Sequence, residues 1–91
     1  MGRKLDPSKD TLDFLSALLE PKRYRQVVAK MMGLLLDPEP PDSSLLKGHP
    51  DLRRADIGEY RIVYRYDEDT LFIVLIGKRN DDEIYRQLKN R

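Results

Sequence analysis

The sequence predicts an α+β fold: a helical hairpin at the N-terminal end, packed on a small antiparallel sheet of three to four strands, with a short helix at the C-terminal end. Apolar residues recur every three to four positions in the first half of the chain, as in helices. In the second half they alternate with polar residues or form short runs, as in strands. A length of 91 residues leaves room for one domain, so residues 1–91 are expected to form a single unit.

The first half predicts two helices separated by a short break. The first is expected to begin at Asp6 and Pro7, as N-cap and first helical residue. Its apolar stripe consists of Leu12, Leu15, Leu18 and Leu19. The second begins at Glu20 and Pro21, and its stripe consists of Tyr24, Val27, Val28, Met31, Leu34 and Leu35. Helices joined so closely are expected to fold back on each other, and the prolines of segment 37–44 end the second helix.

The second half predicts three strands and a final helix. The strands are expected at 53–57, 60–66 and 71–76, and the turns between them at 58–59 and 67–70. In the middle strand, one face is expected to carry Tyr60, Ile62, Tyr64 and Tyr66, and the other Arg61, Val63 and Arg65. The third strand is almost wholly apolar, which is typical of the interior of a sheet. Segment 81–90 is expected to be a short amphipathic helix with acidic residues in its first turn.

The composition limits the kinds of function. The chain has 17 basic and 16 acidic residues and a net charge of +1, so attraction to phosphate must come from arginines gathered on one face. It contains no cysteine, which excludes disulfides and thiolate metal sites and fits a reducing compartment. Neither a signal peptide nor a membrane-spanning run is recognisable. We therefore expect a soluble cytoplasmic protein without a membrane partner.

Few side chains suit catalysis. The single histidine, His49, lies in the segment KGHPD and is expected to be a solvated loop residue rather than a catalyst. No pair of metal ligands, glycine-rich phosphate loop or nucleophile elbow occurs, so no metal and no cofactor are expected. What remains is arginine, whose planar fork suits phosphate oxygens. The arginines on or beside the expected strands are Arg54, Arg61, Arg65 and Arg79. They serve either to bind phosphate or to pair with the equally abundant carboxylates.

Four short motifs in the second half resemble those of the RelE branch of the RelE/ParE toxin superfamily. In chain order they are Leu46-Lys47-Gly48, Gly58-Glu59-Tyr60-Arg61-Ile62-Val63-Tyr64, Gly77-Lys78-Arg79 and Tyr85. Each motif alone is weak, but four in this order are fairly specific. The helical hairpin expected before them agrees with the same family, so the resemblance implies a RelE-like fold.

The resemblance implies a toxin of a type II toxin–antitoxin module, a metal-independent endoribonuclease that cuts messenger RNA in the ribosomal decoding site. In such a reaction the RNA's own 2′-hydroxyl displaces the 5′-oxygen of the next nucleotide and leaves a cyclic phosphate. The implied roles are charge stabilisation at the phosphate for Arg61, general acid for Arg79, nucleotide orientation for Tyr85 and phosphate contact for Arg54. Further substrate contacts are implied for Lys47, Arg65 and Lys78.

Two features depart from the family pattern. Asp56 stands where the family has its proposed lysine base, so Asp56 is a possible base, although a carboxylate also repels phosphate. Residues 1–5 are too few to show clearly the strand with which the family usually opens. Two alternatives stay open: a ParE-like toxin that poisons DNA gyrase, and a degenerate, non-catalytic toxin that acts as a co-repressor. The trio Arg61, Arg79 and Tyr85 favours the nuclease over a pure binder, whereas Asp56 and the near-zero net charge keep the degenerate toxin open.

The resemblance also implies partners. They are a RelB-like antitoxin, the ribosome and its messenger RNA, and operator DNA bound through the antitoxin in a heteromeric complex. A small domain with exposed basic strands is expected to be covered by an acidic, disordered antitoxin segment that folds on binding. We expect that segment to lie across the sheet or to displace the helix at 81–90.

Overall fold

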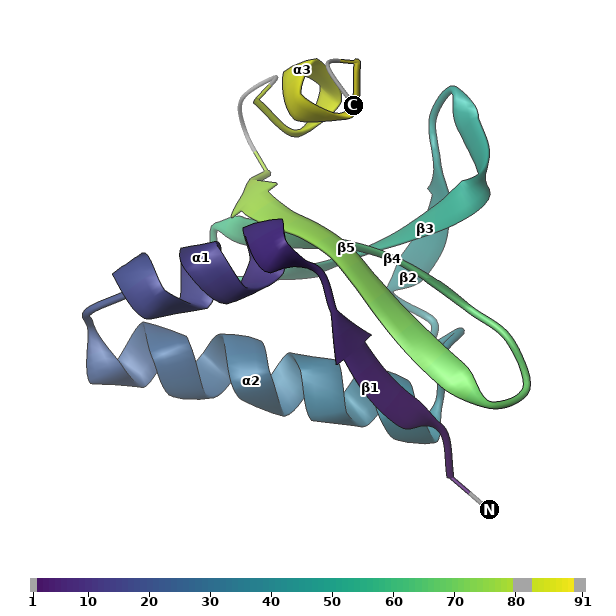
Figure 1. The fold of residues 1–91 in the computed structure, drawn as a ribbon, viewed down its shortest axis with the longest axis horizontal. Coiled ribbons are helices and arrows are strands. Elements are labelled where there is room, and N and C mark those ends of the chain that lie inside the picture. The colour runs from purple at the N-terminus through teal and green to yellow at the C-terminus, as the bar shows by residue number, and fades with distance from the viewer. Residues whose placement is uncertain (1, 80–82, 90–91) are drawn as a thin grey trace.

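The computed structural model describes residues 2–79 and 83–89 and has the predicted α+β architecture (Figure 1). Helices α1 and α2 cover one face of a five-stranded sheet, and helix α3 lies over the other face. The elements in chain order are β1 (Lys4–Pro7), α1 (Lys9–Ala17), α2 (Pro21–Leu36), β2 (Ser43–Leu46), β3 (His49–Ile57), β4 (Tyr60–Tyr66), β5 (Thr70–Lys78) and α3 (Glu83–Lys89). In the described part of the chain, no helix has the length and apolarity needed to cross a membrane.

The helical hairpin forms as predicted, but its first helix begins later than expected. Asp6 and Pro7 belong to strand β1, so the prediction that they begin the helix is wrong. The N-cap is Ser8, whose hydroxyl accepts a hydrogen bond from the N–H of Thr11 at 3.0 Å. The same hydroxyl donates to the carbonyl of Val74 in β5 at 2.6 Å. The cap therefore fastens the start of α1 to the sheet.

The core between the hairpin and the sheet depends more on the second apolar stripe than on the first. Val27, Met31 and Leu34 of α2 are buried, as their spacing predicts. The buried sheet residues in the same cluster are Ala55, Tyr60, Ile62, Tyr64, Leu71, Ile73 and Ile76. Burial of Leu12, Leu19 and Tyr24 was wrongly expected, because their exposed fractions are 51%, 85% and 43%. Leu19 lies beyond the last residue of α1, and Leu12 lies outside the inward face formed by Phe14, Leu15 and Leu18.

The predicted strands are present, but the sheet has five strands in the order β1-β5-β4-β3-β2 rather than three to four. Strand β4 has the predicted bounds, and β3 and β5 extend beyond theirs. Strand β1 pairs with β5 in parallel, so the sheet is mixed and not purely antiparallel. Strand β2, which begins at the end of the proline-rich segment 37–44, pairs antiparallel with β3. Each missed strand has four residues, too few to show an alternating pattern.

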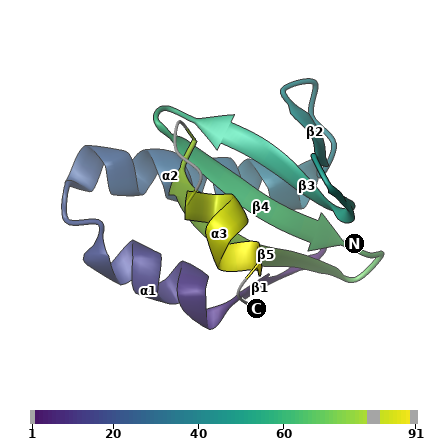
Figure 2. The same cartoon turned by 90° about the horizontal axis from the view of Figure 1, so that it is seen from above.

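A second, smaller core holds α3 against the other face of the sheet (Figure 2). Its buried residues are Leu46, Leu52, Val63, Leu75 and Ile84. Gly77 lies directly beneath the helix, because a Cβ built on it would be only 2.9 Å from Cγ1 of Ile84. A helix was predicted here, and residues 83–89 form it, whereas Asp81, Asp82 and Asn90 lie outside the described residues. The structure thus places α3 close over the strands that carry the arginines.

Candidate functional site

Three charged side chains of β3 and β4 lie together on the face of the sheet that α3 partly covers. Arg54 and Asp56 flank Ala55, which points into the core on the α1–α2 side, so both side chains point to the opposite face. Arg61 pairs with Asp56 across the two strands, and Val63, two residues along, belongs to the α3 core. We call Arg54, Asp56 and Arg61 the arginine–carboxylate cluster.

Asp56 uses both of its oxygens in this cluster. Arg61 donates from Nε to Oδ1 at 2.9 Å and from Nη2 to Oδ2 at 3.4 Å. Arg54 donates from Nη1 to Oδ2, also at 3.4 Å. The side chains of Arg61 and Asp56 are 17% and 25% exposed, so water reaches the cluster but does not surround it. Two guanidinium groups therefore converge on one anionic group at a partly open surface.

Tyr85 of α3 lies beside this cluster. Arg61 pairs with Gly77 of β5, and Gly77 contacts Ile84, the residue before Tyr85. The hydrogen bond to the Asp56 carboxylate raises the pKa of Arg61 above its usual value, against the opposing effect of burial, and the Tyr85 phenol adds to the rise. Arg61 is consequently a permanent cation with a carboxylate and a phenol next to it.

His49 also lies near Tyr85, which the sequence analysis did not anticipate. The two rings have centroids 6.5 Å apart and planes inclined at 38°. His49 is half-buried at the start of β3 and is not a solvated loop residue, so that expectation is wrong. The chain turns sharply at Gly48, with φ of +79°, and this turn brings the histidine back toward α3. Imidazole can both accept and donate a proton, which makes His49 a candidate for proton transfer.

The other expected site residues are more widely spread. The N–H of Arg79 donates to the carbonyl of Glu59 at 3.0 Å, just beyond the end of β5, and its side chain is exposed. Lys47 is exposed in the turn between β2 and β3. Arg65 lies four residues along β4 from Arg61, with its guanidinium 3.9 Å from the ring centroid of Phe72.

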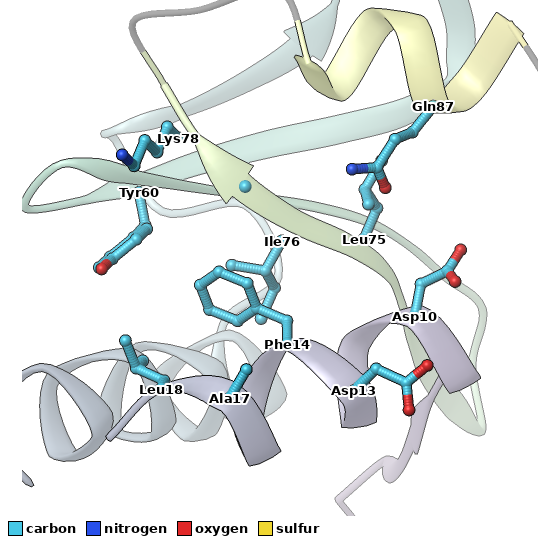
Figure 3. A pocket seen from close by; sticks show the side chains of 11 residues that line it. Asp10, Asp13, Phe14, Ala17, Leu18, Tyr60, Leu75, Ile76, Lys78 and Gln87 are labelled. Carbon is cyan, nitrogen blue, oxygen red and sulfur yellow. The ribbon is translucent and has the colours of Figure 1, made fainter. Parts of the chain in front are cut away.

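Lys78 lies apart from the cluster, at a pocket of about 510 Å³ between α1, the end of β5 and α3 (Figure 3). Phe14 and Leu18 of α1 form one side of this pocket, and Gln87 of α3 reaches it from the other. The pocket wall is mainly apolar with acidic residues of α1 at its rim, which does not suit a phosphate. The pocket is therefore distinct from the arginine–carboxylate cluster, and of the expected site residues it includes only Lys78.

Comparison with solved structures identifies the same fold in toxins of toxin–antitoxin modules. A double arginine-to-alanine mutant of the E. coli toxin RelE in the free state has a TM-score of 0.77, with 24% identity over 99% of this chain and 98% of that one. The archaeal RelE–RelB complex from Pyrococcus horikoshii gives 0.72, with 25% identity over 88% and 98%. The intact E. coli RelBE toxin–antitoxin complex gives 0.71, with 25% identity over 87% and 99%.

Comparison of the sequence is consistent with the fold. No curated protein sequence matches the chain significantly. A family model does match, described as the ParE toxin of the type II toxin–antitoxin system parDE, and it covers residues 8–83. This range includes both helices of the hairpin, the strands β2 to β5 and the arginine–carboxylate cluster. The chain therefore belongs to this family of type II toxins, within the RelE/ParE superfamily.

Proposed function

We propose that this toxin is an endoribonuclease that cuts messenger RNA in the decoding site of the ribosome and so inhibits translation. The observation that carries the proposal is the convergence of Arg54, Arg61 and Tyr85 on one face of the sheet. Guanidinium groups can bind phosphate oxygens, and a phenol can stack on a base or contact the nucleotide. The similarity in fold to RelE toxins supports the same reading.

The proposed reaction needs no metal. The 2′-hydroxyl oxygen of the RNA attacks the adjacent phosphorus, the bond from phosphorus to the 5′-oxygen breaks, and a 2′,3′-cyclic phosphate remains. Arg61 neutralises the charge that develops on the phosphate, and Arg54 holds a second oxygen. Tyr85 fixes the nucleotide so that the attacking and leaving oxygens lie in line.

Two protons must move in this reaction, one from the 2′-hydroxyl and one to the 5′-oxygen. Asp56 and His49 are the candidates to accept the first, because both lie beside the residues that would hold the phosphate. Arg79 is the candidate to act on the leaving oxygen. Since arginine loses a proton only with strong electrostatic help, Arg79 stabilises that oxygen chiefly by hydrogen bonding, and a water molecule at the partly open surface donates the proton to it. Flanking nucleotides are bound by Lys47 and Arg65, whereas Lys78 lies at the mainly apolar pocket, apart from this surface.

The antitoxin partner of this toxin is a RelB-like chain. In the RelE–RelB complex from Pyrococcus horikoshii and in E. coli RelBE, a toxin of this fold is bound to its antitoxin. We propose that the antitoxin occupies the α3 face or displaces α3, because only a small core fastens this helix. Removal of Tyr85 from the cluster would then inactivate the nuclease.

In vitro translation of a defined message, with and without the protein, tests this function. Mapping of the 5′ ends by primer extension should reveal cuts within codons. The cuts should disappear with Arg61→Ala and with Arg79→Ala and persist with Arg25→Ala, whose side chain is exposed on α2 at the opposite side of the sheet. No cuts at all, or equal cutting by Arg61→Ala, would exclude the proposal.

Inhibition of DNA gyrase is the second candidate function, favoured by the description of the matching family as ParE toxins. A supercoiling assay with purified gyrase separates the two. If the protein is a nuclease, supercoiling by gyrase should be unchanged at toxin concentrations that stop translation. If it is a gyrase poison, supercoiling should be lost and the message should stay intact.

A further inference from the structure

Asp56 is bound by the arginines in the manner in which arginines bind a phosphate. Two N–H groups of the Arg61 guanidinium each meet one carboxylate oxygen, and Arg54 adds a third donor to one of these oxygens. A phosphodiester also offers two charged oxygens, and a fork of two parallel N–H donors suits both groups. The donors available to a scissile phosphate are therefore the donors that Asp56 already occupies.

The carboxylate is a strong competitor because it belongs to the same strand pair. Asp56 lies directly opposite Arg61 in the β3–β4 register and two residues from Arg54, so the contact forms without the loss of translational and rotational freedom that a separate RNA molecule would suffer. The three side chains are partly buried, which weakens the screening of their attraction by water. Asp56 also offsets one of the two positive charges that would draw in RNA.

We propose that Asp56 is a specificity-determining residue that occupies the phosphate-binding donors of Arg54 and Arg61, so that free RNA binds poorly and only RNA held in place by another surface displaces it. This inference rests on the proposed function, because it concerns the same site. The inferred substrate class is RNA that another surface already holds in place, as the ribosome holds a message. It also explains in physical terms why Asp56 differs in effect from the lysine that the family has at this position: the carboxylate weakens the binding of RNA, whereas a lysine would strengthen it.

The test measures binding without cleavage. The probe is a short fluorescein-labelled RNA with 2′-methoxy groups, which lacks the attacking hydroxyl, and binding is followed by anisotropy over a range of salt concentrations. Asp56→Asn should bind this probe about tenfold more tightly than the wild type, the effect of freeing one charge-assisted contact. The matched control is Glu68→Gln, which makes the same change of charge in the exposed β4–β5 turn and should stay within about twofold of the wild type.

The inference is overturned if Asp56→Asn binds no more tightly than Glu68→Gln, or if neither variant nor the wild type binds. A measurement on the wild-type protein tests the same inference without relying on correct folding of the Asp56→Asn variant. Inorganic sulfate at saturation should change the ¹³C resonance of the Asp56 carboxylate together with the Nε resonance of Arg61. A change at Arg61 alone would contradict displacement. Because the probe cannot be cleaved and no ribosome is present, these results are independent of the translation assay that decides the proposed function.

Discussion

At the scale of single residues, Gly77 controls how closely α3 approaches the arginines. A Cβ at this position would lie 2.9 Å from Cγ1 of Ile84, so Gly77→Ala must push the helix or its side chain away. We expect a loss of about 1–3 kcal/mol in the free energy of unfolding, measured by urea denaturation. We also expect weaker cleavage, because Tyr85 follows Ile84 in the displaced helix.

Gly33→Ala is the matched control for this prediction. Gly33 lies in α2 with nothing within 4 Å of a Cβ built on it, so alanine should raise the free energy of unfolding by about 0.5–1 kcal/mol. Equal effects of the two substitutions would show that Gly77 matters for backbone reasons and not for the contact with Ile84.

The sequence predicts the arginines of the site better than their partners. Alternation along β4 correctly separates Arg61 and Val63 from the tyrosines that enter the α1–α2 core. The pairing of Asp56 with Arg61 depends on the register between β3 and β4, which follows from the turn at Gly58 and is not visible in either strand alone. The position of His49 was wrongly predicted for the same reason, since its approach to Tyr85 requires both the turn at Gly48 and the docking of α3.

Among the elements, α3 combines a packing role with the functional role proposed for Tyr85. A chain that ends at Arg79 should lose cleavage and also stability, because Val63 and Leu75 would lose their cover. Tyr85→Ala keeps Ile84 in the core beneath α3 but removes a half-buried ring that packs against it, so stability should fall less than in the truncated chain, whereas the cleavage rate should fall about a hundredfold if Tyr85 aligns the nucleotide. Lys89→Ala, at an exposed position of the same helix, should leave the rate unchanged. If the Tyr85→Ala variant kept full cleavage activity, α3 would not be part of the active site.

The cap of α1 provides a second prediction at this scale, concerning stability alone. Ser8→Ala removes both the N-cap hydrogen bond and the link to Val74, and should lower the free energy of unfolding by about 0.5–2 kcal/mol. Ser16→Ala removes an exposed hydroxyl that bonds only within α1, and should cost less than about 0.5 kcal/mol. Chemical denaturation of both variants checks the comparison, and equal costs would mean that the cap does not fasten the hairpin to the sheet.

The elements that the sequence did not predict are those that depend on tertiary pairing. Strands β1 and β2 have four residues each, and prolines lie beside or within them. Their extended conformation comes from hydrogen bonds to β5 and β3 rather than from local preference. The long stripe of α2 and the alternation of β4 are local signals, and both of these elements were predicted correctly.

At the scale of the whole molecule, the sheet is covered unequally. The α1–α2 hairpin closes one face over the larger core, while the other face has one short helix and carries the charged cluster (Figure 2). This asymmetry leaves one side of the toxin for both the proposed substrate and the proposed antitoxin.

If the toxin cuts RNA through the RNA's own 2′-hydroxyl, at a phosphate held by Arg54 and Arg61, the loss of one 2′-hydroxyl should block cleavage at one linkage. The most direct measurement uses a message with a single 2′-deoxynucleotide on the 5′ side of a mapped cut, translated in vitro with the toxin and followed by primer extension. Cleavage by this mechanism should disappear at that linkage and persist at the others. Undiminished cleavage at the deoxy position, or the absence of cleavage from the all-ribose message, would contradict it.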